Sequence, residues 1–184
     1  MTSEDVAASP QALAARVRRA IRDVPDFPKP GIVFKDITPL VADASLFVAV
    51  TSALAQPFLG DGVTHVVGIE SRGFIFAAPV SQHLAASFVP VRKPGKLPFA
   101  SERVEYALEY GTDVLEIHRD ACGARARVLV IDDVLATGGT AAATCALVEK
   151  VGGEVVGCSF LMALSFLSGL TALQGRRVEA IVRY

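Results

Sequence analysis

Short apolar runs alternate along most of the chain with stretches that have helical patterning. Five runs are rich in valine and isoleucine and have the length of buried strands; they span 64–69, 87–91, 128–131, 154–161 and 178–182. The two main helical stretches between them are 73–86 and 139–151. Near-continuous apolar strands separated by helices are typical of a parallel sheet covered on both faces, so the pattern predicts an α/β fold.

The N-terminal part of the chain begins with a predicted helix. Ser9 can cap the free amides of its first turn, and Pro10 suits its first position. Apolar residues then recur at helical spacing over 13–21, and three prolines between 25 and 30 end the helix. Asp43 is expected to cap a second helix.

Two segments fall outside this alternation. The segment 92–111 combines prolines, glycines and mixed charges, and we expect an irregular excursion that acts as a functional loop or lid. Residues 1–8 are expected to form a mobile extension. The 184 residues contain no internal repeat or linker, and this length suits one domain, so a single domain over 1–184 is predicted.

Composition and charge exclude several classes of protein. Eighteen basic against nineteen acidic residues give a net charge of -1, which argues against a nucleic-acid partner held by bulk positive charge. The uncharged stretch 155–175 is interrupted by glycine, serine and threonine, which favours a buried strand and a short helix over a membrane span. The three cysteines form no CxxC pair, and the N-terminal sequence lacks the apolar core of a signal peptide. We expect a soluble cytoplasmic protein.

The most informative stretch is 128–140, Val-Leu-Val-Ile-Asp-Asp-Val-Leu-Ala-Thr-Gly-Gly-Thr. It predicts a buried strand ending at Asp132 and Asp133, then a loop of small residues and a helix beginning near Gly139. In open α/β sheets ligands bind outside the carboxyl ends of the strands, where this loop would lie. The free N–H groups and the dipole of a helix N-terminus make a phosphate site.

The residue types in this loop specify the ligand further. The glycines allow close approach of the backbone to a phosphate, the threonines add hydroxyl donors, and the two carboxylates suit vicinal ribose hydroxyls; together they indicate a ribose 5-phosphate. The loop residues are Ala136, Thr137, Gly138, Gly139 and Thr140. No GxxxxGK[ST] or GxGxxG motif is present. An ordinary strand–turn–helix with two solvated aspartates is the alternative, which the length of the string disfavours.

This string resembles the 5-phosphoribosyl 1-diphosphate (PRPP) signature of the type I phosphoribosyltransferases. Three further stretches narrow the resemblance to the adenine phosphoribosyltransferase family. They are FPKPGIVFKDIT at 27–38, GIESRGF at 68–74, and RKPGKLP at 92–98 with YALEYG at 106–111. The resemblance implies the type I fold, with a mostly parallel sheet flanked by helices, a small N-terminal hood that binds the base, and a flexible lid.

The resemblance also implies an activity. Members of this family transfer ribose 5-phosphate from PRPP to N9 of adenine, which yields AMP and diphosphate through an oxocarbenium-like transition state. The reaction depends on Mg²⁺, which is held mainly by PRPP and water rather than by the protein. A homodimer is implied as well.

The resemblance also assigns roles to individual residues by their position in the matching motifs. The first group would bind the base and the sugar phosphate. Backbone groups of Val33 and Lys35 would bind adenine, with apolar contacts from Phe34 and Leu135. Asp132 and Asp133 would hold the ribose hydroxyls, and the loop 136–140 the 5′-phosphate.

The remaining residues that carry over surround the diphosphate and the reacting base. Ser71 and Arg72 lie in a turn that suits the diphosphate. Arg92, Lys93 and Lys96 would add positive charge, with Arg92 reaching across the dimer interface. Glu109 is the candidate general acid/base at adenine N7, and Tyr110 shares its lid. Two residues depart from the family pattern. Pro94 puts the stiffness of the basic loop in question rather than the chemistry, and Lys35, where family members often carry arginine, matters little if its backbone binds the base.

Two other functions remain open at this point. A sibling transferase would act on xanthine, hypoxanthine or orotate, since the PRPP signature does not select the base; the segment 31–35 and the Leu-Glu-Tyr-Gly stretch favour adenine. A PRPP-sensing regulator would have kept the fold and lost turnover. The segment before residue 27 is too short for a winged helix, which counts against a regulator. His65, His83 and His118 show no metal-ligand spacing.

Overall fold

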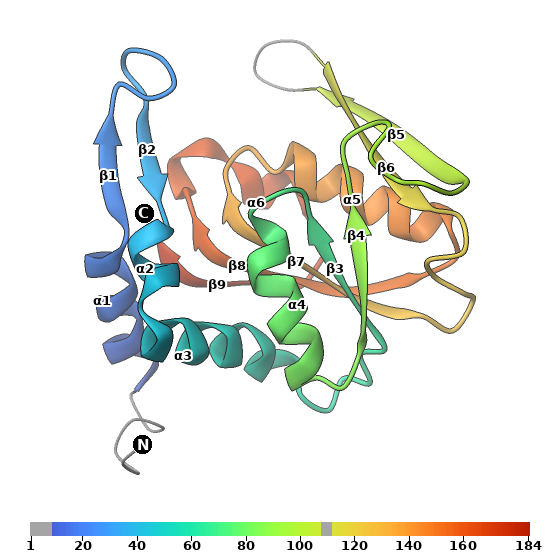
Figure 1. Cartoon of the computed structure of the whole chain (residues 1–184), viewed down its shortest axis with the longest axis horizontal. Coiled ribbons are helices and arrows are strands. Elements are labelled where there is room, and N and C mark those ends of the chain that lie inside the picture. The colour runs from blue at the N-terminus through green and yellow to red at the C-terminus, as the bar shows by residue number, and fades with distance from the viewer. Residues whose placement is uncertain (1–8, 108–111) are drawn as a thin grey trace.

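A computed structural model describes residues 9–107 and 112–184. Figure 1 shows the arrangement of its elements. The strands are β1 (Arg22–Pro25), β2 (Val33–Asp36), β3 (His65–Ile69), β4 (Ser87–Val91), β5 (Ser101–Ala107), β6 (Thr112–His118), β7 (Arg127–Leu135), β8 (Glu154–Ala163) and β9 (Val178–Arg183). The helices are α1 (Pro10–Ala20), α2 (Thr38–Ala42), α3 (Ala44–Ala55), α4 (Gly73–His83), α5 (Gly139–Lys150) and α6 (Gly169–Ala172), with 3₁₀ turns η1 (Gln56–Phe58) and η2 (Ser165–Leu167).

The central sheet has five strands in the order β4-β3-β7-β8-β9, and all its neighbouring strands are parallel. The predicted mostly parallel sheet flanked by helices is therefore confirmed. Strand β7 lies in the middle of this sheet, paired with β3 on one side and β8 on the other. The carboxyl end of β7 consequently lies among those of its neighbours, where an α/β sheet binds its ligands.

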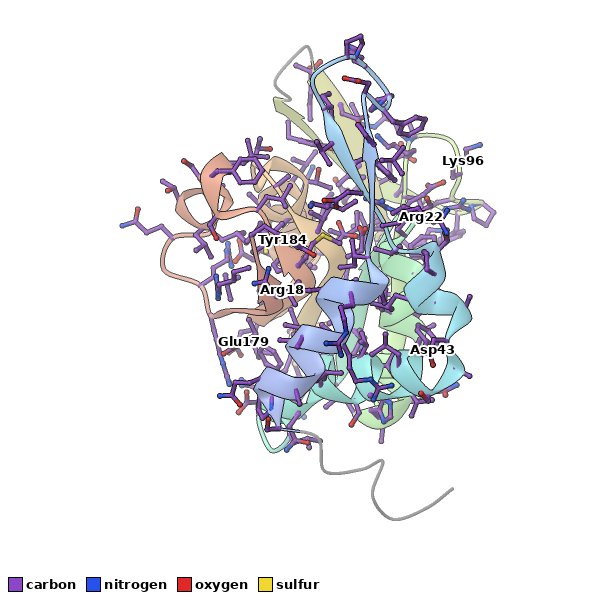
Figure 2. The ribbon with its side chains drawn as sticks, turned by 90° about the vertical axis from the view of Figure 1, so that its left-hand side faces the viewer. Arg18, Arg22, Asp43, Lys96, Glu179 and Tyr184 are labelled. Atoms are coloured by element: carbon purple, nitrogen blue, oxygen red, sulfur yellow. The ribbon has the colours of Figure 1, made fainter. Side chains whose placement is uncertain are left out.

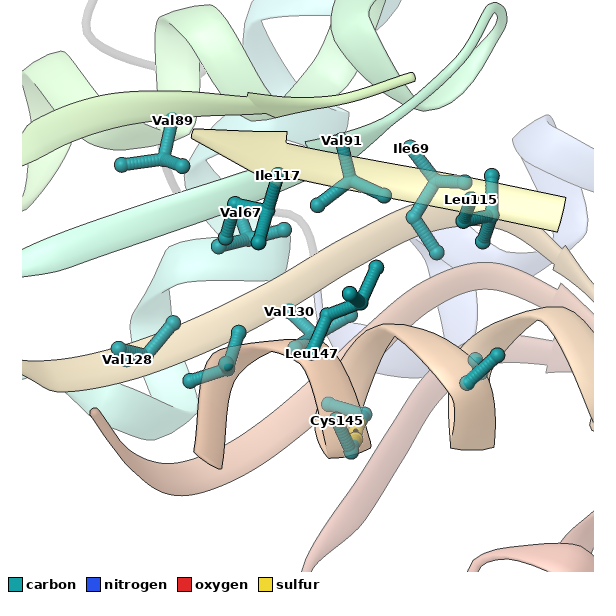
Figure 3. Packing of buried hydrophobic residues seen from close by; sticks show 14 of the residues in the cluster. Val67, Ile69, Val89, Val91, Leu115, Ile117, Val128, Val130, Cys145 and Leu147 are labelled. Atoms are coloured by element: carbon teal, nitrogen blue, oxygen red, sulfur yellow. Dashed lines mark hydrogen bonds between the residues drawn. The ribbon is translucent and has the colours of Figure 1, made fainter. Parts of the chain in front are cut away.

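The sheet has a hydrophobic core on each face because successive side chains of a strand point to opposite sides. Leu129 and Ile131 of β7 join the core formed with α1, α3 and α4. Val128 and Val130 join the core formed with α5 and with β6, and Figure 3 shows this packing. All four side chains are fully buried. Burial on both faces explains why the β7 sequence is a continuous apolar run rather than an alternating one.

Several predicted boundaries are confirmed. The Ser9 hydroxyl accepts a hydrogen bond from the Ala12 amide at 3.2 Å at the start of α1. The Asp43 carboxylate accepts one from the Leu46 amide at 3.0 Å and caps α3. The uncharged stretch 155–175 forms most of β8 and then η2 and α6. Across the described ranges, 9–107 and 112–184, no helix is both long enough and apolar enough to span a bilayer.

Two expectations about secondary structure were wrong. Strand β7 does not end at the carboxylates but continues through them to Leu135, because Asp132 and Val134 still pair with β8. The segment 92–111 is not wholly irregular, since residues 101–107 form β5, which pairs antiparallel with β6. The hairpin was missed because β5 opens with three consecutive polar residues, Ser101, Glu102 and Arg103, and alternates polar and apolar residues only over 103–106. Residues 1–8, expected to be an extension, and 108–111 lie outside the described ranges.

The hairpin of β1 and β2 stands beside the central sheet (Figure 1). Its strands pair antiparallel, with Asp23 opposite Lys35 and Val24 opposite Phe34. It is a two-stranded sheet of its own, and it carries Val33, Phe34 and Lys35, which the sequence assigns to base binding together with Leu135 of β7.

Candidate active site

A cavity of about 330 Å³ opens at the carboxyl ends of β3 and β7. Its lining includes Ser71, Arg72 and Lys93. It also includes Asp132, Asp133, Leu135, residues 136–138 and Thr140. The structure thus brings together residues from three separate stretches of the sequence, and most of the residues predicted to bind PRPP are among them.

The loop 136–140 joins β7 to α5. Gly138 has φ +83° and precedes the first residue of the helix, in a region that L-residues with a side chain rarely adopt. Because glycine at the N-cap has no side chain, no side-chain hydrogen bond caps the N-terminus of α5. The first amides of the helix therefore remain free to bind an anion. The Thr140 hydroxyl donates a hydrogen bond to the Tyr106 oxygen at 3.4 Å, which joins the loop to β5.

Helix α6 supports this loop from behind. A Cβ atom on Gly169 would lie 2.2 Å from the carbonyl oxygen of Ala136, and one on Gly138 would lie 2.5 Å from the carbonyl oxygen of Gly169. Only glycine at both positions allows the two backbones to pack this closely. Sequence reasoning missed Gly169 because it lies about thirty residues beyond the loop and belongs to no motif.

The two aspartates at the end of β7 lie in different surroundings. Asp133 is almost fully buried, and its Oδ2 lies 3.0 Å from Nη2 of Arg72 in an ion pair without hydrogen-bond geometry. Asp132 is half-buried and accepts a hydrogen bond from the Asp133 amide at 2.9 Å. Gly73 of α4 faces it closely, since a Cβ there would lie 2.8 Å from Asp132 Oδ1.

Burial raises the pKa of both aspartates. For Asp132 the pKa lies well above its ordinary value because the carboxyl is desolvated and the negative charge of Asp133 is adjacent. For Asp133 desolvation also raises the pKa, and the Arg72 guanidinium opposes this rise. Burial makes the charged form of both carboxyl groups costly. Adjacent carboxyl groups kept in such surroundings are typical of a binding site rather than of a purely structural pair.

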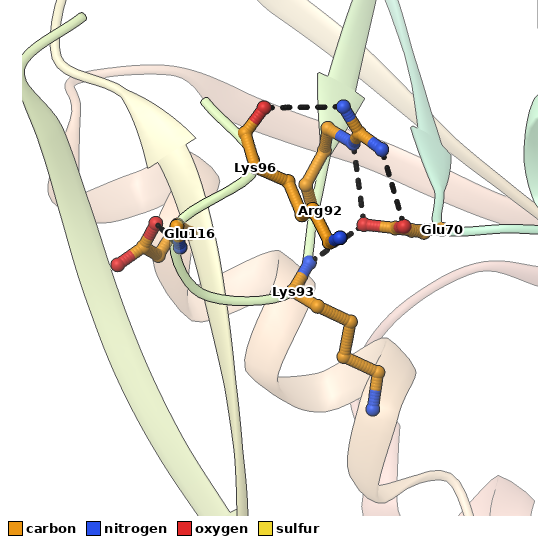
Figure 4. Close-up of polar contacts among 6 residues, drawn as sticks. Glu70, Arg92, Lys93, Lys96 and Glu116 are labelled. Atoms are coloured by element: carbon orange, nitrogen blue, oxygen red, sulfur yellow. Dashed lines mark hydrogen bonds and ion pairs between the residues drawn. The ribbon is translucent and has the colours of Figure 1, made fainter. Parts of the chain in front are cut away.

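The basic turn 92–96 is held by two carboxylates, as Figure 4 shows. Glu70 accepts hydrogen bonds from Nε and Nη2 of Arg92, both at 3.2 Å, and from the Lys93 amide at 2.9 Å. Arg92 also donates to the Lys96 carbonyl at 3.1 Å. Glu116 accepts from the Gly95 amide at 3.1 Å. Burial would raise the pKa of Glu70, but these hydrogen bonds and the Arg92 charge hold it below its ordinary value.

Lys93 leads from this turn into the cavity. Its ammonium pairs with the carboxylate of Asp113, which also accepts a hydrogen bond from the Tyr106 hydroxyl at 3.2 Å. The pKa of Asp113 is lowered, because these donors outweigh the effect of burial. A chain of polar contacts therefore runs from Lys93 through the hairpin of β5 and β6 to Thr140 of the loop 136–140.

Other predicted residues are placed elsewhere. Arg92, Lys96 and Gly139 do not line the cavity, and Lys96 is exposed. Val33 is half exposed, and Lys35 pairs with Asp23 at 2.7 Å. Glu109 and Tyr110 lie outside the described residues.

Phe34 does not line the cavity either, but the guanidinium of Arg72, which does, lies 4.9 Å from the centre of its ring. Sequence reasoning assigned no role to Glu70, Tyr106 and Asp113, although Glu70 and Tyr106 stand inside two of the stretches that carry the resemblance. Asp113 lies outside every stretch that carries the resemblance, so nothing in the sequence marked it.

Comparisons with known proteins agree with this site. A family model for the phosphoribosyl transferase domain matches residues 42–165. The adenine phosphoribosyltransferase of Methylococcus capsulatus is 52% identical over 92% of this chain and 99% of its own length. The crystal structure of the Rhodothermus marinus adenine phosphoribosyltransferase has a TM-score of 0.91 and 50% identity, and covers 95% of this chain and 99% of its own.

A third relative is known with ligands. The Saccharomyces cerevisiae adenine phosphoribosyltransferase was crystallised with adenine and D-2,5-dideoxy-2,5-imino-altritol 1,6-bisphosphate. It has a TM-score of 0.87 and 35% identity, and covers 93% of this chain and 99% of its own. Because these similarities extend over nearly the whole chain and include the strand, loop and helix that form the cavity, the chain belongs to the adenine phosphoribosyltransferase family of type I phosphoribosyltransferases.

Proposed function

We propose that this chain transfers ribose 5-phosphate from PRPP to N9 of adenine and releases AMP and diphosphate, a reaction of purine salvage. The observation that carries the proposal is the junction of β7 and α5. Two carboxylates, Asp132 and Asp133, and an uncapped helix N-terminus line one cavity. A sugar with a vicinal diol and a terminal phosphate supplies the complementary groups.

The sugar would be held along β7 and the phosphate loop. Asp132 and Asp133 accept hydrogen bonds from the two ribose hydroxyls, and the free amides of α5 bind the 5′-phosphate. This fixes C1 of the ribose while the bond to diphosphate breaks and positive charge develops on the sugar. Two nearby carboxylates also stabilise that charge.

The leaving group would be bound next to the sugar, by the basic residues of the same cavity. Arg72 and Lys93 line the cavity there and neutralise negative charge as it grows on the diphosphate. Mg²⁺ prefers oxygen ligands, which a diphosphate and water supply. In the described part of the chain no three or more His, Cys, Asp or Glu side chains cluster to hold a metal, and we propose that PRPP and water hold Mg²⁺. When bound, Mg²⁺ adds charge neutralisation at the diphosphate.

The base would lie between the cavity and the hairpin of β1 and β2. Leu135 lines the cavity, and the Phe34 ring contacts the guanidinium of Arg72, which also lines it. We propose that both side chains contact the apolar ring of the base. The backbone of Val33 and Lys35 would supply the hydrogen bonds that select adenine. The adenine bound in the Saccharomyces cerevisiae relative supports this choice of base. We propose Glu109 as the general acid/base at N7, with Tyr110 beside it.

A panel of bases tests the proposed function. The purified chain, with Mg²⁺ and PRPP, is expected to convert adenine to AMP and to give little product with hypoxanthine, guanine, xanthine or orotate. Nucleotide product would be followed by chromatography. Product from another base would keep the PRPP site and overturn the base assignment. PRPP binding without product from any base would favour a regulator, and a nucleic-acid binding assay with and without PRPP would then be decisive.

We also propose that the chain forms a homodimer in which Arg92 serves the partner's site. An exposed apolar surface leads to this residue. Phe88, 38% exposed, stacks edge to face on Phe74, and Phe99, 64% exposed, contacts the ring of His118. The Arg92 guanidinium lies 5.9 Å from the centre of the Phe74 ring. Apolar surface next to a cation that does not itself line its own chain's cavity supports an interface at this place.

A hybrid dimer tests this arrangement. Arg92→Ala and Asp132→Asn chains carrying different affinity tags would be co-expressed, and the dimer holding one of each would be purified. We expect each variant alone to lose most activity and the hybrid to recover about half of the wild-type rate, since one of its two sites has both residues. A hybrid as inactive as its parents would mean that Arg92 acts within its own chain, and failure to isolate any hybrid would argue against the dimer.

We further propose a cytoplasmic location. It is supported by the three cysteines, which are all buried free thiols. Cys145 and Cys158 lie with their sulfur atoms 3.7 Å apart and form no disulfide, as is usual in a reducing compartment.

A further inference from the structure

Tyr184, which follows β9, is fixed by its backbone to the end of the central sheet. Its amide donates a hydrogen bond to the Ala163 carbonyl at 2.9 Å, and its carbonyl oxygen accepts one from the Ser165 amide at 2.9 Å. Both partners belong to the region where β8 ends. The ring of Tyr184 is therefore attached to a part of the molecule that the main core holds in place.

This ring is contacted by two cations from different elements. The guanidinium carbon of Arg18, in α1, lies 4.8 Å from the ring centre. The ammonium of Lys35, in β2, lies 4.3 Å from it. Arg18 also donates a hydrogen bond to the Arg183 carbonyl. Figure 2 shows Tyr184 beside Arg18, near the point where α1 leads into the hairpin.

Lys35 connects these contacts to the hairpin of β1 and β2. Its side chain is only 18% exposed, and its ammonium lies between the Tyr184 ring and the carboxylate of Asp23, 2.7 Å away in β1. On the cavity side, the neighbouring Phe34 ring faces Arg72. Two cation–ring contacts thus join the hairpin to the body of the protein. In one, Lys35 of the hairpin contacts the Tyr184 ring; in the other, Arg72 of the body contacts the Phe34 ring of the hairpin.

We propose that Tyr184 is a positioning residue for the base-binding hairpin. The ring attracts the Lys35 ammonium through its electron-rich face, and this holds the backbone of residues 33–35 at a fixed distance from the cavity. Loss of the ring leaves the chemistry at the diphosphate and the ribose unchanged but loosens the segment that binds the base. The inference rests on the proposed function, in which this segment binds adenine.

Two substitutions at position 184 and one control test the proposal. Tyr184→Ala is expected to raise KM for adenine about 3- to 10-fold, the factor that a cation–π contact is typically worth. KM for PRPP and kcat at saturating adenine should stay within about twofold, because uniform binding is lost rather than transition-state binding. Tyr184→Phe keeps the ring and should behave as the wild type. Phe166→Ala, which removes a ring that is 71% exposed nearby, should change neither KM.

The outcomes separate a positioning role from a general structural one. Equal increases in both KM values, an unchanged KM for adenine, or a Tyr184→Phe variant as impaired as Tyr184→Ala would each overturn the proposal. If Tyr184→Ala does not fold, Tyr184→Leu decides instead: it keeps apolar bulk at this position, removes the electron-rich ring face that the Lys35 ammonium contacts, and should raise only KM for adenine, again about 3- to 10-fold. Absence of AMP formation by the wild-type chain would instead refute the proposed function, so the two failures are distinguishable.

Discussion

Replacing Gly169 with alanine should lower kcat/KM for PRPP about 100-fold, the scale of loss expected when a binding group is displaced by about 1 Å. The new Cβ would lie 2.2 Å from the Ala136 carbonyl oxygen and 3.1 Å from its carbonyl carbon. Both are backbone atoms, so no side-chain rotation relieves the overlap, and the phosphate loop must move away from α6. The free amides at the start of α5 then no longer converge on the 5′-phosphate.

The matched control for this prediction is Gly123→Ala. A Cβ at Gly123 has no atom within 4 Å, so this variant makes the same chemical change without an overlap and should keep wild-type kinetics. Steady-state rates with PRPP varied, together with thermal unfolding, check both variants. Overpacking of this kind costs about 1–3 kcal/mol of stability, so Gly169→Ala should remain folded at 25 °C. Wild-type kinetics in a folded Gly169→Ala would show that α6 does not fix the loop.

The parts of the fold that the sequence predicted well are those in which local pattern and tertiary environment agree. Strands β3, β7 and β8 are buried on both faces and therefore read as continuous apolar runs. The loop 136–140 stood out in the sequence because its glycines and threonines are residue types that allow a backbone to approach a phosphate, and the structure places most of it in the cavity lining. Ser9 and Asp43 cap their helices by contacts three residues long, which any sequence window includes.

What the sequence could not predict depends on contacts between distant residues. The ion pairs of Glu70 with Arg92 and of Arg72 with Asp133 join residues 22 and 61 positions apart, and only the parallel order of β3, β4 and β7 brings them together. The contact of Gly169 with Ala136 arises in the same way. Strand β5 was missed for another reason: it lies outside the central sheet, and its run of polar and charged residues is also typical of a loop.

Replacing Asp132 with asparagine should impair activity and at the same time stabilise the fold at neutral pH. The amide oxygen can still accept the hydrogen bond that Asp132 Oδ1 accepts from the Asp133 amide at 2.9 Å, so the local backbone should be preserved. The negative charge that would bind a ribose hydroxyl is lost, and kcat/KM for PRPP should fall roughly 10- to 100-fold, the value of a hydrogen bond to a charged group.

The effect on stability follows from the raised pKa of Asp132, which burial and the charge of Asp133 cause. Above the unfolded pKa of about 4, the native state holds this proton more tightly than the unfolded chain, so stability is lost as pH rises through the folded pKa. Asparagine does not titrate. The melting temperature of Asp132→Asn minus that of the wild type should therefore be positive at pH 8 and smaller at pH 4.

The matched control is Asp120→Asn, at an exposed carboxylate that does not line the cavity. It makes the same change in net charge, and its kcat/KM for PRPP and its melting temperature should equal those of the wild type at both pH values. A difference for Asp132→Asn that is the same at both pH values would contradict the raised pKa. Unchanged kinetics would remove Asp132 from the ribose site. Activity and stability moving in opposite directions at one residue would show that its buried charge is retained for binding the substrate, since the fold alone would be more stable without it.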